Sequence, residues 1–241
     1  MDKLIYTAVS GAERLMRAQQ VHANNLANLD TSGFRASLEA SSSEALRGYG
    51  YDDVHLSAMQ ADTISTRAGS VRDTGRPLDV AIGGQGYLAV QFGDGEAYTR
   101  SGEIDIGADG ALSVKGHALL GEGGAIVLPP HTAVEIGTDG TISVLTEGAT
   151  QMQVVDKLRL VNAEGAELTK NQAGLIVARD GAALAADPAV QVRSRALEGS
   201  NVSAVEEMVA TMSLNRSFEM QMKLFQASDK MNEAGNRLLG A

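Results

Sequence analysis

Few residue patterns in this sequence could do chemistry. The run Gly83-Gly84-Gln85-Gly86 could cradle a phosphate. A phosphate loop needs a following helix whose N-terminus faces the anion, whereas strand-like residues follow here. The spacing from Asp105 to Asp109-Gly110 resembles a calcium loop but lacks the alternating oxygen ligands and the final glutamate. We therefore expect a turn at each place and neither a nucleotide nor a calcium site.

Metal-ligating and nucleophilic residues are equally sparse. The sequence has no cysteine, and its four histidines, at positions 22, 55, 117 and 131, stand far apart. A zinc site is therefore not expected. No Gly-x-Ser-x-Gly elbow occurs, and no pair of carboxylates stands out as acid and nucleophile. The sequence predicts no catalytic, cofactor-binding or metal-binding residue, and the protein is not expected to be an enzyme.

The charge is unevenly distributed along the chain. Of the 241 residues, segments 1–35 and 200–241 together carry no net charge, so the formal charge of −10 falls on residues 36–199. An acidic middle argues against nucleic acid as a partner. No apolar run approaches the 18 or so residues that a membrane span needs. Charged residues at 13, 14 and 17 interrupt any secretory signal, so no cleaved signal peptide is expected.

The last forty residues read as one long helix. Large apolar side chains recur there at steps of three and four residues, which is the period of one helix face. Ser200-Asn201 offers N-cap chemistry, and Glu206 follows in the first turn, where an acidic side chain favours the helix dipole. The members of this row are Val205, Met208, Met212, Phe218, Met222 and Phe225.

A second helix is predicted over residues 3–28. Ile5, Leu15 and Leu26 belong to its apolar stripe. The run Asn24-Asn25-Leu26-Ala27-Asn28 then meets turn-forming residues at 30–33, which stop the helix. Helix capping alone would account for these asparagines, because an asparagine tolerates left-handed backbone and binds orphan carbonyls.

The middle of the chain reads as β structure. Residues 36–68 show no clear period, and we expect an irregular connector there. Residues 69–199 alternate with period two and hold 21 of the 27 glycines, and several Asp-Gly pairs predict hairpins. The segment 106–114 returns thirty residues later as 136–144, which indicates two similar hairpins in one domain.

Together these elements predict an α+β fold. Two long terminal helices are expected to pack together like a coiled coil and to form one discontinuous helical assembly domain, over 1–35 and 200–241. A mostly antiparallel β domain, over 69–199, would be inserted between them after the connector.

The chain ends resemble a known family. Asn24-Asn25-Leu26-Ala27-Asn28 with Gly33-Phe34-Arg35 is similar to the N-terminal signature of the rod and hook proteins of the bacterial flagellum. Their C-terminal signature is similar to Leu197-Glu198-Gly199-Ser200-Asn201-Val202, followed by Val205–Met208 and Arg216–Lys223. Within that family, four further segments of this chain resemble the proximal-rod type: 76–81, 98–102, 116–124 and 184–188.

The resemblance implies a structural protein. Such a protein polymerises through its terminal helices into the proximal rod, a periplasmic drive shaft of the flagellar basal body. Its partners would be itself, other proximal and distal rod proteins, and the flagellar type III apparatus that exports it unfolded. The helices would line the export channel, with the β domain outside them.

Roles for single residues follow from the same reading. The apolar residues at 5, 15 and 26, and the row from Val205 to Phe225, are expected to pack helices together in the assembly. The family-motif residues Asn24, Asn25, Asn28, Gly33, Phe34, Ser200, Asn201, Glu206 and Glu219 are candidates for polar registry between subunits.

Three other interpretations remain open at this point. The first is a distal-rod or hook subunit of the same family. A secreted β-domain enzyme or glycan-binding module is disfavoured by the missing carboxylate pair and by an aromatic content of 4%. A coiled-coil adaptor is disfavoured by the two signatures at the chain ends.

Overall fold

The computed structural model describes residues 2–45, 55–171 and 173–239. Two compact units divide the chain, and each is described by itself. Residues 1–27, 37–62 and 203–241 form the helical unit, and residues 28–36 and 63–202 form the β unit. The chain therefore passes between the units four times.

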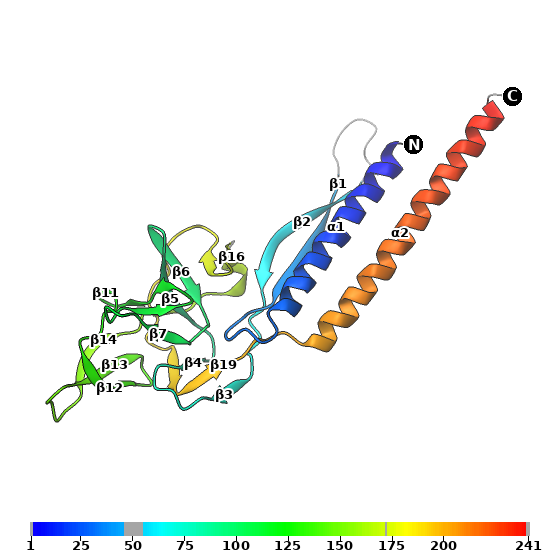
Figure 1. Ribbon diagram of the computed structural model, residues 1–241. Coiled ribbons are helices and arrows are strands. Elements are labelled where there is room, and N and C mark those ends of the chain that lie inside the picture. Colours follow the sequence, from blue (N-terminus) through cyan, green and yellow to red (C-terminus); the bar gives the residue numbers. More distant parts are fainter. Residues whose placement is uncertain (1, 46–54, 172, 240–241) are drawn as a thin grey trace. The chain divides into compact units, whose positions relative to one another are not determined.

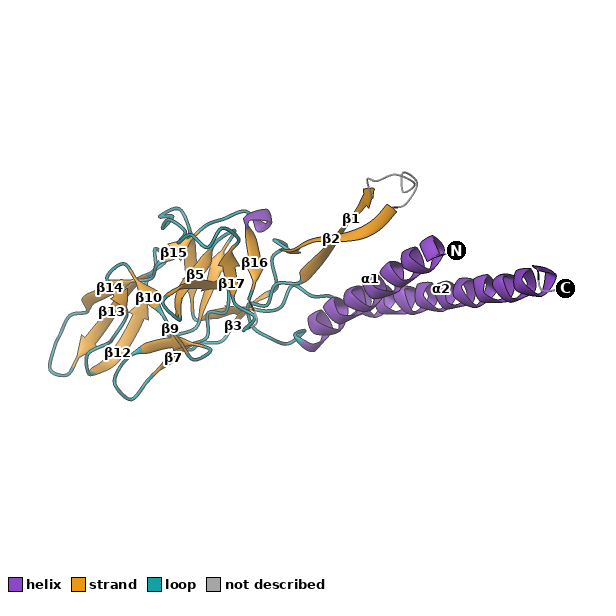
Figure 2. Ribbon diagram, turned by 90° about the horizontal axis from the view of Figure 1, so that it is seen from above, coloured by secondary structure: helices purple, strands orange, loops and turns teal. Residues whose placement is uncertain are grey.

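The helical unit contains two helices and a two-stranded sheet. Helix α1 spans Asp2–Ala27 and helix α2 spans Ala204–Leu239, and both lack an internal proline. They run side by side in both views (Figures 1 and 2). Strands β1 (Ser37–Ala45) and β2 (His55–Ile64) pair with each other.

The start of α2 differs from the prediction in its capping residue. The backbone N–H of Glu206 donates to the Ser203 hydroxyl at 3.4 Å, so the N-cap is Ser203. Ser200 lies further upstream, and its hydroxyl accepts a hydrogen bond from the Val202 backbone N–H at 3.3 Å.

The β unit is built from short antiparallel strands, as its many turns require (Figure 2). A five-stranded sheet has the order β15-β5-β6-β17-β16, and two three-stranded sheets have the orders β12-β13-β14 and β7-β8-β9. The strands of the large sheet are β5 (Tyr87–Phe92), β6 (Gly95–Thr99), β15 (Leu160–Val161), β16 (Leu168–Lys170) and β17 (Ile176–Ala178), with a 3-10 turn at Gly165–Glu167 before β16. Those of the three-stranded sheets are β7 (Ile104–Ile106), β8 (Leu112–Val114), β9 (His117–Ala118), β12 (His131–Ile136), β13 (Thr141–Thr146) and β14 (Gln153–Lys157). The remaining strands form three pairs: β3 (Val71–Asp73) with β19 (Ala196–Glu198), β4 (Val80–Gly83) with β18 (Gln191–Ser194), and β10 (Leu120–Gly121) with β11 (Gly124–Ala125).

The thirty-residue repeat is visible as a repeated turn. Gly107 N–H donates to the Ala111 carbonyl at 2.8 Å, and Gly137 N–H donates to the Thr141 carbonyl at 2.8 Å. The two Asp-Gly pairs at 109–110 and 139–140 form the turns, each with its glycine at positive φ. The repeat read from the sequence is thus a structural repeat within the β unit.

The β unit has an apolar core made of two clusters of buried side chains. Alternation along β13 buries Ile142 and Val144 and turns Ser143 outward, as a half-buried strand requires. Leu88, Ile104 and Leu112 are fully buried in the same cluster. This unit therefore encloses an apolar core of its own, although some apolar side chains such as Met152 and Val154 stay exposed.

The expected fold class is wrong. Among the described residues the chain has nineteen strands and two helices, so it is mostly β, and α1 is the shorter helix. The first part of the row that we expected between the helices is exposed on α2, with Val205 at 71% and Met212 at 63%. Further along the row, Phe218 is half-buried, and Met222 and Phe225 are exposed beside α1. Among the described residues, this row therefore makes no continuous coiled-coil seam. In the first turns the half-buried residues are Glu207 and Thr211, each one position before the expected Met208 and Met212.

The connector also differs from the expectation. Residues 37–45 and 55–64 form strands β1 and β2, although their sequence showed no clear period. The rest of the expected connector, residues 46–54, lies outside the described part of the chain.

Candidate assembly surface

An exposed apolar patch occupies the first turns of α2. Val205, Met208, Val209 and Met212 are all at least half exposed, and we name them the α2 patch. At about 100° per residue they fall within an arc of about 100°. Exposed apolar residues continue along the helix at Met220, Leu224 and Met231.

The half-buried residues of α2 form a different row. Glu207, Thr211, Leu214, Phe218 and Gln221 recur at steps of three and four, the period of one helix face. This row lies roughly opposite the α2 patch. The helix thus has one face within its own unit and a second apolar face that is open, although an apolar helix face is normally buried.

A groove between α1 and α2 holds an apolar cavity of about 210 Å³. Its lining is Val9 and Ala12 from α1 with Gln221, Met222 and Phe225 from α2. A β-carbon added to Gly11 would lie 2.2 Å from the side-chain nitrogen of Gln221, so the end of this glutamine lies directly against Gly11. We name this feature the α1–α2 groove.

A polar cluster joins α1, β1 and α2 within the helical unit. Asn25 is buried, and its side-chain nitrogen donates to the Glu207 carboxylate at 3.1 Å and to the Ser37 carbonyl at 3.1 Å. Its side-chain oxygen accepts from the Ser37 N–H at 3.0 Å. His22 Nδ1 pairs with the other oxygen of Glu207. Asn25 therefore bonds within the subunit, where a helix cap or subunit registry was expected.

In the β unit, one buried carboxylate holds two guanidinium groups. Glu198 is 2% exposed and lies 2.9 Å from Arg35 Nη2 and 2.7 Å from Arg100 Nη2. It also accepts the Gly69 N–H at 2.8 Å. Burial, and after it the neighbouring Arg100 cation, lower the pKa of Arg35 from its ordinary value. We name Arg35, Arg100 and Glu198 the buried ionic joint.

Arg100 has its other donors satisfied by backbone. They bond the carbonyls of Ile82 at 2.9 Å, Gly84 at 2.8 Å and Gly86 at 2.8 Å. Gly33, at φ +67°, lies against the Arg100 backbone, and an added β-carbon would come within 2.2 Å of it. A side chain at position 33 is therefore excluded by the space as well as by the backbone conformation.

Asn201 ties together the segments that leave the β unit. Its side-chain oxygen accepts the Ala36 N–H at 2.7 Å, and its nitrogen donates to the carbonyls of Ser65 at 3.3 Å and Arg67 at 2.7 Å. Its backbone N–H donates to the Phe34 carbonyl at 3.2 Å. Segments 34–36, 65–67 and 198–201, which are remote in the sequence, thus meet at one buried polar site.

The other predicted residues lie on several surfaces. Leu15 is buried, and Leu26 and Phe218 are half-buried, whereas Met222 and Phe225 are exposed at the groove. Asn24, Glu206 and Glu219 are exposed; Asn28 accepts a hydrogen bond from the Thr31 hydroxyl, and the Phe34 ring lies 3.8 Å from Lys170 Nζ. Ile5 lies in α1, outside the part whose side chains the structure describes.

Sequence reasoning missed the buried ionic joint. Arg35 and Glu198 were quoted as members of the two terminal signatures, but neither was given a role. Arg100 lies in a strand-like stretch with nothing to mark its burial. The one available signal was that the family signatures lie at opposite ends of the chain, which indicated that the two ends, with their charged residues, come together.

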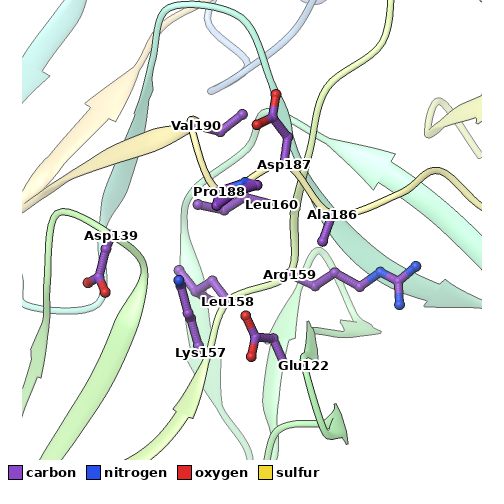
Figure 3. A pocket seen from close by; sticks show the side chains of 10 residues that line it. All are labelled: Glu122, Asp139, Lys157, Leu158, Arg159, Leu160, Ala186, Asp187, Pro188 and Val190. Atoms are coloured by element: carbon purple, nitrogen blue, oxygen red, sulfur yellow. The ribbon is translucent and has the colours of Figure 1, made fainter.

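A second cavity, of about 220 Å³, opens on the β unit (Figure 3). Charged side chains from Glu122, Asp139, Lys157, Arg159 and Asp187 line it, with no aromatic ring among the lining residues. Asp187 accepts the Ala189 N–H at 2.9 Å, and Arg159 pairs with Glu96 at 3.3 Å. Asp187 and Arg159 are thus engaged in local structure, and none of the lining residues offers an aromatic ring for stacking on a sugar.

Comparison with known proteins decides the family. Three family profiles match: flagella basal body rod protein over residues 5–35, flagellar hook protein FlgE/F/G D1 domain over 81–144, and flagellar basal body rod FlgEFG protein C-terminal over 193–238. The flagellar basal-body rod protein FlgF of Salmonella typhimurium strain LT2 is 42% identical to this chain, over 99% of both proteins. The chain belongs to the FlgF family of flagellar basal-body rod proteins.

Other relatives follow the same pattern. FlgF of Escherichia coli strain K12 is 40% identical over 99% of both chains. The rod protein FlgG of Bacillus subtilis strain 168 is 28% identical over 96% of this chain and 97% of its own. This FlgF-family chain is thus a structural subunit of the rod. None of its described helices is long and apolar enough to cross a membrane.

Proposed function

We propose that this FlgF-family chain joins the rod through the open apolar surfaces of its terminal helices. The observation that carries the proposal is the α2 patch, which lies on the face of α2 opposite its half-buried row. An apolar face left open by its own subunit calls for a partner, and membership of a rod family supports a neighbouring rod subunit as that partner.

The energetics favour many contacts over one. Full burial of a valine or methionine side chain stabilises by roughly 1.5–3 kcal/mol, so four half-exposed side chains offer roughly 3–6 kcal/mol. Association costs about 4–15 kcal/mol in lost freedom of motion. One patch therefore holds two copies together only weakly. A subunit with several neighbours makes several such contacts but loses its freedom of motion only once.

The finer proposals extend what the family supports. We propose a place in the proximal rod, within the periplasm, with proximal and distal rod proteins as neighbours. Export through the flagellar type III apparatus without a cleaved signal, and the absence of catalysis, belong to the same proposal. In this arrangement segments 1–35 and 200–241 serve assembly, and residues 69–199 face outward.

The proposal is tested by charging the open helix surface. Met222→Asp and Met208→Asp each place a carboxylate in a contact that assembly would bury, and the expected result is loss of the protein from isolated basal bodies. The β unit should keep its unfolding transition, because neither residue belongs to it.

Met152→Asp is the matched control, since Met152 is an exposed methionine of the β unit. It should incorporate normally. Normal rods from Met222→Asp and Met208→Asp would contradict the proposal.

A further inference from the structure

We propose that four methionines on the open face of α2 form a site of reversible oxidation, and that their sulfoxides keep the free chain from joining the rod. The proposal rests on the proposed function and adds a chemical modification that regulates it. The residues concerned, which we name the methionine face, are Met208, Met212, Met220 and Met231.

The methionine face is one surface of the helix. At about 100° per residue its four members fall within an arc of about 140°, roughly opposite the half-buried row of α2. Each of the four side chains is between 50% and 68% exposed. Another methionine of α2, Met222, lies at the α1–α2 groove. An oxidant in solution therefore reaches all four thioethers of the methionine face in the single chain.

The sulfur of this chain is concentrated on α2. The sequence has nine methionines and no cysteine, so no thiol competes with the thioethers for an oxidant. Leucine and methionine gain similar free energies on burial, and either would make α2 apolar. Methionine differs from leucine in carrying an atom that oxidation converts from apolar to polar. The methionine face is therefore an apolar surface that chemistry can switch.

The oxidant is a peroxide, with hydrogen peroxide as the simplest example. The thioether sulfur attacks one peroxide oxygen, so that an S–O bond forms and the O–O bond breaks. The sulfur-bound oxygen gives its proton to the departing hydroxide, which becomes water. The sulfur loses two electrons and the peroxide gains them. The product is methionine sulfoxide, which methionine sulfoxide reductases convert back to methionine.

The sulfoxides act on assembly and leave the packing of the subunit intact. The half-buried row, which faces the rest of the helical unit, contains no member of the methionine face. In a contact between subunits, each sulfoxide oxygen is an acceptor among apolar groups, and burial of an acceptor without a donor is costly. The same contact shields the sulfur atoms of assembled chains. Oxidation therefore acts on the chain before assembly.

The first test uses the unaltered chain. Cells that produce it receive a short pulse of hydrogen peroxide before rods form. Mass spectrometry then gives the fraction of sulfoxide at each methionine, in the free chain and in isolated basal bodies. Sulfoxide at the methionine face should be depleted about tenfold or more in the basal bodies, as the burial of an unsatisfied acceptor predicts. Met152, an exposed methionine of the β unit, is the internal control and should carry the same fraction in both samples.

The second test is a competition between two chains in one cell. A variant with leucine at the four positions keeps the apolar surface and loses its sulfur. It should enter basal bodies as often as the unaltered chain without peroxide, and severalfold more often after the pulse. The changes combined in this variant are Met208→Leu, Met212→Leu, Met220→Leu and Met231→Leu.

Three outcomes would overturn the proposal. The first is an equal fraction of sulfoxide at the methionine face in free and assembled chains. The second is a methionine face that stays reduced while Met152 is oxidised. The third is a competition that the pulse leaves unchanged. Normal incorporation of Met208→Asp and Met222→Asp would instead remove the proposed function beneath it.

Discussion

The two units of this chain treat buried and exposed side chains in opposite ways. In the β unit, large apolar residues such as Leu88 and Leu112 are fully buried, and even three charged groups are enclosed in the buried ionic joint. In α2, none of the residues whose side chains the structure describes is buried. The β unit thus encloses an apolar core of its own, whereas α2 exposes most of its described large apolar side chains.

This difference indicates which substitutions should change the stability of a single subunit and which should change its assembly. In the core of the β unit, we expect a substitution to act on the stability of the single subunit. On the open faces of the helices, where we propose that neighbours pack, we expect a substitution to act on assembly. Three experiments test this contrast, in order of decreasing expected effect.

Removal of the buried carboxylate should have the largest effect. Glu198→Gln leaves Arg35 and Arg100 buried without a counter-charge, and loss of one partner of a buried ion pair costs about 3–5 kcal/mol. The free energy of unfolding of the β unit, measured with urea, should fall by this amount. Asp73→Asn is the control, because the Asp73–Arg193 pair at 2.7 Å is mostly exposed and is worth about 0–1 kcal/mol. Equal effects of the two substitutions would refute a special role for the joint.

Leucine truncation compares the two units directly. Leu112→Ala empties a fully buried site in the β unit and should cost about 2–5 kcal/mol. Leu214→Ala removes a half-buried side chain of α2 and should cost about 1 kcal/mol or less in the monomer. Thermal denaturation of both variants checks the ratio. A loss at Leu214 as large as that at Leu112 would mean that α2 is already packed in the single subunit.

The smallest effect is expected at the repeated turns. Asp139 accepts the Thr141 hydroxyl at 2.7 Å and the Thr141 N–H at 3.2 Å, and these bonds lower the pKa of Asp139 from 3.8. Because the folded-state pKa is lowered, the stabilisation is present above the ordinary pKa and is lost as the pH falls through the folded value.

Thr141→Ala removes the hydroxyl and makes this turn like its partner, where Asp109 accepts only the Ala111 N–H at 3.2 Å. The pKa of Asp139 should then rise toward 3.8, which a carboxyl titration by NMR would show. An unchanged titration would mean that the hydroxyl bond does not form in solution.

The sequence predicted local structure better than long-range contacts. Both long helical segments and the paired Asp-Gly hairpins follow from periods and turn residues that lie within a few positions of each other. The phase of α2 did not follow, because apolar residues occur on both of its faces and periodicity alone does not tell which face is turned inward. Strands β1 and β2 were missed because apolar and polar residues do not alternate regularly along either of them.

The buried ionic joint and the Asn201 site could not be predicted from the sequence for a different reason. Glu198 meets Arg35 and Arg100 across long stretches of chain, and Asn201 meets residues near 36 and 66. No spacing rule connects such positions. Gly33 is a partial exception. A glycine beside a turn indicates a positive φ, but it does not indicate that the Arg100 backbone lies against it.

The central claim is that the β unit is complete in the single subunit and the terminal helices are not. Hydrogen exchange read segment by segment, on the dilute monomer and on assembled rods, tests it most directly. We predict slow exchange for the core strands between residues 80 and 198 in both samples. Exchange in α1 and α2 should be fast in the monomer and slow in the rod. Helices that are as well protected in the monomer as in the rod would contradict the account.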